Sequence, residues 1–408
     1  MLGVPFPPNS WGQGVCRNPV EKCELSTVSR EGHFPRGWVA VLWREDGVRG
    51  DTQADSEGHR MKIAIVAPPW APIPPLAYGG IEAVVHELAT GLVERGHEVV
   101  LVTTGDSTCP VVRVETRPFA EGYRIGSAVP ELLHAAAALD SVHGCDVVHD
   151  HTVAGPFLVA RKWDSPPMVT TCHGDLSGEL GDLYRHLEGR VPIVAISHSQ
   201  RDAAPDVPVA RVIHHGIDAA NFPRGNGKGG YVMYLGRMCF EKGAHRALHA
   251  AHRAGVRLLV AAKMREAEER RYFERYVEPY LNDDLRYVGE VSHEEKLELL
   301  AGAAGLLLPI RWNEPFGLVM LEAMACGTPV LAFPEGAAPE VIDHGRTGLL
   351  CHDEYDMAAA IGRLGDLDRG ACRAAVEGYF SKDRMVTEHL ELYEALVAID
   401  DNTRMAAS

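Results

Sequence analysis

The stretch that decides the fold runs from Glu314 to Val330 and reads EPFGLVMLEAMACGTPV. It follows an apolar run at 305–308 that is typical of a buried strand, and a short polar loop separates the two. Pro315 suits the first turn of a helix, and Gly327 suits the residue just after its last turn. The stretch therefore predicts a strand, a loop and a helix, which is the repeating unit of a parallel α/β sheet.

The start of this predicted helix offers an anion site, because the first backbone N–H groups of a helix have no partner inside it. These groups belong to Gly317, Leu318 and Val319, and the missing Cβ of Gly317 lets a ligand approach closely. Glu322 can accept hydrogen bonds from a ribose diol, and Glu314 can accept them from sugar hydroxyls. The alternative is a buried crossover helix with two solvated carboxylates. We favour a diphosphate site, because loop, glycine and carboxylates meet at one strand end.

A second stretch, LGRMCFEKG at 235–243, supports the first. It follows a predicted strand at 231–236, so Arg237 and Lys242 extend from a loop at the carboxyl end of that strand. Two cations there can neutralise a leaving diphosphate. The alternative is a pair of ordinary surface charges, which is less expected directly after a first strand.

Apolar strands alternate with helical patterns from Lys62 onward, which indicates α/β architecture with doubly wound parallel sheets. A single core rarely exceeds about 300 residues, so 408 residues predict two domains. A glycine-rich segment at 223–230 reads as a flexible hinge between two Rossmann-like halves, 61–224 and 225–378. Ligands of such sheets bind at the carboxyl ends of the strands, so we expect the site in the cleft between the halves.

The first 60 residues read differently from the rest. Proline and glycine interrupt every periodic pattern apart from a short candidate strand at 38–43. The segment lacks the basic start, apolar run and cleavage site of a secretory signal. Met61 opens a clear strand, so we interpret 1–60 as a poorly ordered extension, for which an upstream start site is one explanation. An inactive or insoluble 61–408 fragment would refute this interpretation.

Charge and hydropathy exclude several classes of protein. Forty basic and 56 acidic side chains give a net charge of −16, which argues against nucleic acid as the main partner. The longest apolar run, 301–310, is about half of the roughly 20 residues that a transmembrane helix needs. Nine scattered cysteines without a CxxC pair predict a cytoplasmic protein rather than a disulfide framework or a zinc module.

With these motifs the sequence resembles the retaining glycosyltransferases of family 4 (glycosyl transferases group 1), which have the GT-B fold. The resemblance runs from Met61 to about Ala398. Glu314 and Glu322 match the family's two glutamates separated by seven residues, and Arg237 and Lys242 match its diphosphate-binding pair. The resemblance implies two Rossmann-like domains that face each other across a cleft. It also implies transfer of a hexose from a nucleotide-diphosphate sugar with retention of configuration.

The resemblance also implies roles for single residues. Gly79 and Gly80 resemble the glycine-rich loop near the donor phosphates, and His173 resembles the histidine beside the donor sugar. The segment 379–400 resembles the helix that crosses back to the first domain. The implied catalytic residues are His173, Arg237, Lys242 and Glu314, and the implied donor-binding residues are Gly79, Gly80, Arg237, Lys242, Glu314, Phe316, Gly317, Leu318, Val319 and Glu322.

One loop departs from the family pattern. Relatives usually carry two adjacent glycines in the segment that corresponds to 334–340, and here only Gly336 remains. We therefore expect the backbone next to the donor to differ slightly from that of relatives, whereas Glu340 keeps its expected place.

The implied mechanism is front-face substitution, because no carboxylate is clearly placed to act as a nucleophile for double displacement. The leaving diphosphate itself helps to take the acceptor proton, and the cations, the helix start and the glycine amides stabilise the leaving group. On this account the protein needs no metal and no cofactor. Asp366 and Asp368 have a DxD spacing but read as a solvated turn. His149 and His151 read as an acceptor-facing loop, with metal binding as the minority interpretation.

Partners and rival functions follow from the same residues. We expect Lys263, Glu290 and Val291 to face the nucleobase. Residues 61–225 carry 12 basic and 19 acidic groups, which favours a sugar or small-molecule hydroxyl acceptor over a membrane surface. The alternatives are a GT-B-fold epimerase acting on a nucleotide sugar and a non-catalytic nucleotide-sugar-binding protein. A glycogen-phosphorylase-like enzyme does not fit, because the chain is short and shows no pyridoxal site.

Overall fold

The computed structural model describes residues 60–77, 79–120, 125–159 and 166–407. The segment interpreted as an N-terminal extension lies outside the described residues up to position 59, and so does Tyr78 beside the glycine-rich loop. The described strands form two parallel sheets, one of seven strands and one of six. The prediction of an α/β chain with two Rossmann-like sheets is therefore confirmed.

The strand order of each sheet reverses beside the first strand of that half. The first sheet runs β3-β2-β1-β4-β5-β6-β7 and the second runs β10-β9-β8-β11-β12-β13. Open α/β sheets bind their ligands at such reversal points, outside the carboxyl ends of the strands. The strands are β1 (Lys62–Val66), β2 (Glu98–Thr104), β3 (Val112–Arg117), β4 (Val147–Asp150), β5 (Met168–Thr171), β6 (Ile193–Ala195), β7 (Val209–Val212), β8 (Val232–Arg237), β9 (Leu258–Lys263), β10 (Leu285–Gly289), β11 (Leu306–Leu308), β12 (Val330–Ala332) and β13 (Gly348–Leu350).

Helices cover both faces of each sheet, so alternate residues of a strand enter different cores. Ile63 and Ile65 of β1 pack in one core with α2 and α14, whereas Ala64 and Val66 pack in a core on the opposite face. Burial on both faces explains why the strands read as continuous apolar runs. The helices are α2 (Gly80–Glu94), α3 (Ala128–Ser141), α4 (Gly155–Val159), α5 (Glu179–Arg185), α6 (His198–Asp202), α7 (Ala244–Ala254), α8 (Ala267–Tyr276), α9 (His293–Gly302), α10 (Leu318–Ala325), α11 (Ala338–Val341), α12 (Glu354–Ile361), α13 (Arg369–Gly378) and α14 (Lys382–Ala407), with short 3-10 turns at Ala219–Asn221, Glu278–Tyr280 and Leu364–Asp366.

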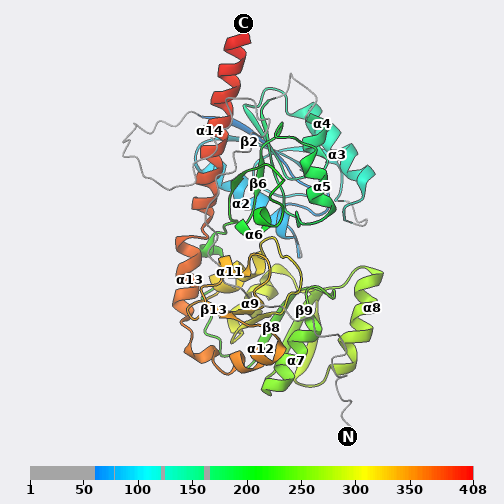
Figure 1. The fold of residues 1–408 in the computed structure, drawn as a ribbon, viewed down its shortest axis with the longest axis vertical. Helices are drawn as coiled ribbons and strands as arrows, with labels where there is room; N and C mark the ends of the chain where they lie inside the picture. The colour runs from blue at the N-terminus through cyan, green and yellow to red at the C-terminus, as the bar shows by residue number, and fades with distance from the viewer. Residues whose placement is uncertain (1–59, 78, 121–124, 160–165, 408) are drawn as a thin grey trace. The chain divides into compact units, whose positions relative to one another are not determined.

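The last helix of the chain packs on the first sheet, not on the second. α14 contacts α2 and β4, and Figure 1 shows it in red beside the first sheet. Met385 and Tyr393 of α14 are fully buried in the core that also holds Ile63 and Ile65. The helix implied for the segment 379–400 is therefore present, and it runs from Lys382 to Ala407.

Two strands of the structure have no counterpart in the prediction. β3 reads VRVETR, and its side chains are exposed or half-buried. β13 has only three residues. β3 lies at the edge of its sheet and buries little apolar surface, so it lacks the continuous apolar pattern of the central strands. β13 is also an edge strand, but it is apolar and largely buried.

The helix expected from Pro315 begins later, at Leu318. Gly317 lies directly before it with a φ of +82°, in the left-handed region that favours glycine. Pro315 and Phe316 belong to the preceding loop, because the chain turns into the helix only at this glycine. The end of the helix agrees with the prediction, since Gly327 follows it with a φ of +74°.

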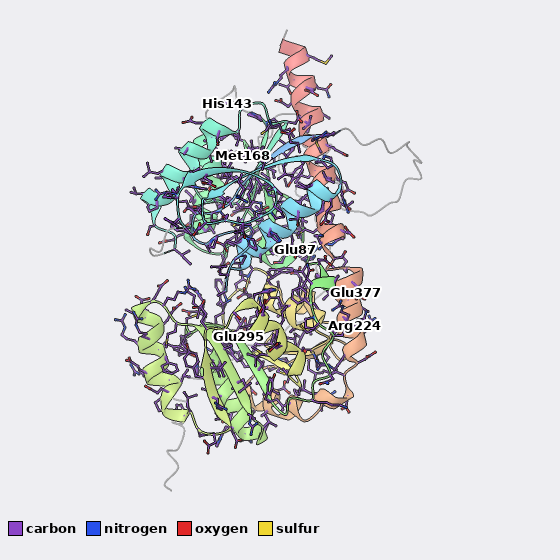
Figure 2. All side chains as sticks on the ribbon, turned by 180° about the vertical axis from the view of Figure 1, so that it is seen from behind. Glu87, His143, Met168, Arg224, Glu295 and Glu377 are labelled. Carbon is purple, nitrogen blue, oxygen red and sulfur yellow. The ribbon has the colours of Figure 1, made fainter. Side chains whose placement is uncertain are left out.

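The segment expected to be a flexible hinge is anchored to the second half. The Gly225 N–H donates to the carbonyl of Cys326 over 2.9 Å. Arg369 of α13 donates to the carbonyl of Gly225 over 3.3 Å. Arg224 lies 3.3 Å from the carboxylate of Glu377, and Figure 2 shows these two side chains near each other. The segment therefore has a defined course, which corrects the interpretation as a free linker.

Two features of the structure bear on the expected absence of a membrane span and of disulfides. Among the described helices, none has both the length and the hydropathy that crossing a membrane requires. The seven cysteines within the described residues are all free thiols.

Candidate active site

Two loops of the second half meet at one edge of its sheet; one carries cationic side chains and the other a carboxylate. Arg237 is the last residue of β8, and Lys242 follows in the loop that leads to α7. Glu314 lies in the loop after β11, and β11 is the neighbour of β8 in the sheet. The Lys242 ammonium donates to the Glu314 carboxylate. The structure thus brings together two residues that lie 72 positions apart in the sequence.

Glu314 is buried, with 8% of its surface exposed, and its Oε2 atom accepts from two donors. One donor is Lys242, which forms an ion pair with it. The other is the indole N–H of Trp312, at 2.7 Å. Lys242 Nζ also lies 5.1 Å from the centre of the Trp312 ring, within range of a cation–π contact. A buried carboxylate needs such partners, so these contacts hold both charges at the strand end.

The start of α10 lies directly beyond this carboxylate. Gly317 is the residue before the helix, and no side chain of that residue caps the first N–H groups. These groups belong to the segment 317–319, and they carry the positive end of the helix dipole. The helix start therefore keeps the donors that an anion requires, as the sequence predicts.

Glu322, on the same helix, forms an ion pair that the sequence did not reveal. Lys296 of α9 donates to Glu322 Oε1 over 2.6 Å. The side chains of the two residues are 14% and 12% exposed, so water screens this pair only weakly. The pair leaves Glu322 with a second carboxylate oxygen for a ligand. A lysine in an exposed-looking helical pattern gives no signal of this contact, because it depends on how α9 and α10 pack.

The loop with the single glycine presses against the backbone of Glu314. A Cβ built on Gly336 would lie 2.2 Å from the carbonyl oxygen of Glu314 and 2.4 Å from its nitrogen. Gly336 also has a φ of +56°. The next residue, Ala337, donates its N–H to the same Glu314 carbonyl over 2.9 Å. The position of Glu314 therefore depends on a glycine in a different loop.

In the first half, Gly79 and Gly80 lie at the start of α2. Gly79 is the residue before the helix, and it has no side chain to cap the first turn. A Cβ on Gly79 would lie 2.6 Å from the Cβ of Pro75, so the loop is closely packed. Glu82 follows in the first turn, and burial raises the pKa of its carboxyl group to about 7. The glycine loop thus leads into a helix whose first acidic residue is protonated more readily than usual.

His173 follows β5 and lies in a row of histidine rings. Its ring stacks on that of His215 with the centroids 5.3 Å apart, and on that of His151 at 5.2 Å. Its Nε2 atom lies 2.9 Å from Nδ1 of His151. Burial lowers the pKa of His173 to about 3, so its imidazole is neutral at physiological pH. His151 was expected in an acceptor-facing loop, and its contact with His173 was not predicted.

Two of the three residues expected at the nucleobase have protein partners. Lys263 is buried and lies 3.6 Å from the carboxylate of Glu269. Glu290 is exposed and receives two hydrogen bonds from Arg265, at 2.8 and 3.0 Å. Lys263 is the last residue of β9 and Glu290 follows β10, at the same sheet edge as the Glu314 loop. Val291, the third of them, is half-buried.

One group among the described residues has the composition of a metal site. Ligand atoms of His198, His214 and Glu340 lie within 4.8 Å of one another. Glu340 already accepts from His214 Nε2 at 2.7 Å and from the backbone N–H groups of His198 and Ser199 at 2.9 and 2.6 Å. These hydrogen bonds lower the pKa of Glu340, and they occupy its carboxylate with donors from the protein. It links residues after β6 and β7 to α11 and needs no ion for that role.

In the other candidate metal segment, at 149–151, His149 and Asp150 are engaged in hydrogen bonds. His149 is fully buried; its Nδ1 lies 2.6 Å from the Tyr393 hydroxyl and its Nε2 lies 2.7 Å from that of Thr171. Asp150 accepts from the N–H and hydroxyl of Thr152. The DxD segment is also structural, since Asp368 caps α13 by accepting from Gly370 N–H.

The buried histidines predict a stability that falls in acid. Burial holds the pKa of His149, His151 and His215 well below 6.5 and lowers those of His173 and His389 to about 3 and about 4. Below pH 6.5 the unfolded chain protonates these side chains while the folded chain does not. The unfolded state then binds more protons, so the free energy of unfolding decreases as the pH drops.

Four acids with raised pKa values, Glu82, Glu87, Glu131 and Asp150, oppose this trend. Burial raises the pKa values of Glu82 and Glu87 to about 7 and that of Asp150 to about 8. Between their unfolded pKa values, near 4, and these folded values, the folded state binds the extra proton. Their contribution therefore decreases as the pH rises. Among the described residues, eleven histidines have lowered pKa values and four acids have raised ones, so the histidine trend dominates between pH 5 and 6.5.

We expect the free energy of unfolding in urea to rise from pH 5 to pH 6.5. A His389→Gln variant should lower the slope by about 1.4 kcal/mol per pH unit, the effect of one proton. His143→Gln is the matched control, because His143 is exposed and lies on the surface in Figure 2. A protein equally stable at both pH values, or equal slopes in both variants, would contradict the expectation.

Comparison with known proteins places this geometry in a family. A model of the family described as Glycosyl transferases group 1 matches residues 219–367, and a model of Glycosyltransferase Family 4 matches residues 78–221. The glycogen synthase of Mycobacterium tuberculosis (strain H37Rv) is 29% identical over 372 residues, which cover 77% of this chain and 88% of that protein.

Solved structures agree with the family models. AviGT4, a glycosyltransferase involved in avilamycin A biosynthesis, is 25% identical and superposes with a TM-score of 0.62 over 83% of this chain and 98% of its own. The Anabaena protein HepE, solved in complex with UDP-glucose, is 18% identical and superposes with a TM-score of 0.65 over 82% of this chain and 100% of its own. The chain therefore belongs to the family 4 glycosyltransferases (glycosyl transferases group 1) and has their GT-B fold.

Proposed function

We propose that the protein transfers a hexose from a nucleotide-diphosphate sugar to a hydroxyl of a sugar or small molecule, with retention of the anomeric configuration. The observation that carries this proposal is the contact between Lys242 and Glu314 beside the uncapped start of α10. One strand edge thus presents a cation, a helix start and a carboxylate. These are the groups that a diphosphate and an attached sugar require.

Each group has a part in the proposed reaction. Arg237, Lys242 and the N–H groups of 317–319 bind the diphosphate and stabilise its charge as it leaves. Glu314 and His173 bind the sugar, and Glu322 accepts hydrogen bonds from the ribose. When a donor arrives, the Lys242 ammonium exchanges part of its contact with Glu314 for the phosphate oxygens.

The proposed chemistry is a front-face substitution. The bond between the anomeric carbon and the diphosphate oxygen breaks, and a bond to the acceptor oxygen forms on the same face. The acceptor proton passes to the leaving diphosphate, so protons and charge balance without a protein base. Positive charge at the diphosphate comes from the protein itself, which is why the proposal includes no metal and no further cofactor.

We propose the donor and the acceptor by their chemical class, a nucleotide-diphosphate hexose and a hydroxyl compound. Lys263, Glu290 and Val291 lie at the sheet edge where the nucleobase is expected. The acidic first half favours an uncharged hydroxyl acceptor over an anionic surface. A cytoplasmic location is proposed on the free cysteines alone.

Lys296 should matter for donor binding because it holds Glu322. We expect Lys296→Met to raise the donor Kd about tenfold, since a hydrogen bond to a charged group contributes about 1.5–3 kcal/mol. Titration calorimetry with the nucleotide sugar measures this change. Glu298→Gln, an exposed position on the same helix, is the control and should leave the Kd unaltered. Equal donor affinity in Lys296→Met and the parent protein would refute the assignment.

A panel of nucleotide sugars tests the proposed function. UDP-, ADP-, GDP- and dTDP-linked hexoses are added separately, and the thermal midpoint is measured first, because a ligand that binds the folded state raises it. The donor that stabilises the protein is then incubated with mono- and disaccharides. Release of the nucleoside diphosphate together with a glycoside supports the proposal. An epimerised nucleotide sugar supports the epimerase, and binding without turnover supports the non-catalytic binding protein.

A further inference from the structure

Two histidines of the first half share a hydrogen bond that the reaction proposed above does not use. His151 follows β4 and His173 follows β5, and these strands are neighbours in the sheet. Nδ1 of His151 lies 2.9 Å from Nε2 of His173. Nε2 of His151 is buried and has no hydrogen-bond partner. His173 is half-buried, so its remaining nitrogen, Nδ1, is the one available to a ligand.

The hydrogen bond restricts both rings to two proton arrangements. Burial keeps the pKa values of both imidazoles far below neutrality, so each ring carries a single N–H. In the first arrangement, His151 donates from Nδ1 and His173 accepts at Nε2, which puts the His173 proton on Nδ1. In the second, His173 donates from Nε2 and His151 carries its own proton on Nε2.

The unpartnered nitrogen distinguishes these arrangements. In the second one, His151 Nε2–H is a buried donor without an acceptor, whereas in the first one Nε2 is only an unused lone pair. Buried N–H groups without partners are rarer than buried acceptors without partners. The neighbouring ring of His149 cannot supply an acceptor nitrogen, because both of its nitrogens are engaged by Tyr393 and Thr171. The first arrangement is therefore favoured.

We propose that His151 is a positioning residue that donates Nδ1–H to His173 and thereby fixes His173 as the Nδ1–H tautomer. His173 then offers a hydrogen-bond donor, not an acceptor, to the bound sugar. A donor at this place engages a lone pair of a sugar hydroxyl and stays neutral beside the diphosphate. This inference rests on the proposed function for the identity of the ligand, but the tautomer itself does not depend on it.

Two substitutions separate the hydrogen bond from the packing of the ring. His151→Asn keeps an N–H close to the position of Nδ1 and removes Nε2. His151→Leu fills a similar volume but has no donor. We expect His151→Asn to retain kcat within about threefold, and His151→Leu to lower kcat by about tenfold or more with a smaller change in KM. A role in packing alone would lower both variants equally and would appear in their thermal midpoints.

The direct test is the proton position on His173 in the full-length protein without substrate. The chain is labelled with ¹⁵N-histidine, and the His173 signals are assigned from their loss in His173→Gln. Imidazole ¹⁵N shifts and two-bond couplings then report which nitrogen is protonated. We expect Nδ1–H in the parent protein and in His151→Asn, and a different or mixed tautomer in His151→Leu.

Protonation of His173 at Nε2 in the parent protein would overturn the inference, even if His151→Leu fails to fold. The same tautomer in all three proteins would overturn it as well. Because no donor is present in this measurement, its failure is distinct from a failure of the proposed glycosyl transfer, which the donor panel reports separately.

Discussion

Replacing Lys242 by methionine is expected to lower kcat/KM for the sugar donor by roughly 10²–10³-fold, or about 2–4 kcal/mol. Methionine keeps the length of the side chain and removes the charge. Lys242 is the cation that contacts Glu314 at the strand edge, so its loss removes positive charge from the position where the diphosphate leaves. Steady-state kinetics with the donor found in the panel measure the effect.

Loss of Lys242 also leaves Glu314 with one fewer partner, so stability has to be measured beside activity. A buried carboxylate that loses a charged partner is destabilising, and the thermal midpoint of Lys242→Met should fall. Lys242→Arg keeps the charge and should recover part of the activity. Lys228→Met is the matched control, since Lys228 is an exposed lysine. If Lys242→Met turned over the donor as fast as Lys228→Met does, the assignment of Lys242 would be wrong.

Substitution of Gly336 by alanine is expected to lower both stability and activity. The new Cβ would lie within 2.4 Å of two backbone atoms of Glu314, so one of the two loops has to move. We expect a loss of about 2–5 kcal/mol in the free energy of unfolding, from left-handed backbone strain and overpacking together. The displaced Glu314 should also weaken binding of the donor.

Gly345→Ala separates the two causes. Gly345 has a φ of +85°, so alanine there suffers the same backbone strain, but a Cβ at this position meets no atom within 4 Å. We expect it to cost about 1–2 kcal/mol and to leave donor binding unaltered. Urea unfolding and calorimetry of both variants measure these effects. Equal losses of stability in the two variants, with normal donor affinity, would mean that Gly336 does not position Glu314.

The central strands and the two-sheet architecture could be predicted from the sequence because they are buried on both faces. β1, β6 and β11 contain continuous apolar runs, and such runs have few other interpretations between helical patterns. The edge strand β3 lacks that signal, because its side chains are exposed or half-buried. The edge position of a strand becomes known only when its neighbours are known.

The backbone parts of the site were also open to prediction, whereas the side-chain partners were not. Gly327 follows the end of α10 as predicted, because local conformation decides where a helix ends, whereas the helix begins at Leu318 and not at Pro315. The contact of Lys296 with Glu322 and that of His151 with His173 join residues 26 and 22 positions apart. Such contacts depend on how separate elements pack, and a periodic pattern carries no information about them.

The most direct test of the central claim is the anomeric configuration of the product. The full-length protein is incubated with the α-linked nucleotide hexose that stabilises it and with the acceptor that supports release of the nucleoside diphosphate. Proton NMR at early times then reads the coupling of the anomeric hydrogen in the glycoside formed. Our account predicts an α-glycoside and one nucleoside diphosphate for each hexose transferred. A β-glycoside, or a nucleotide sugar that is epimerised without forming a glycoside, would contradict it.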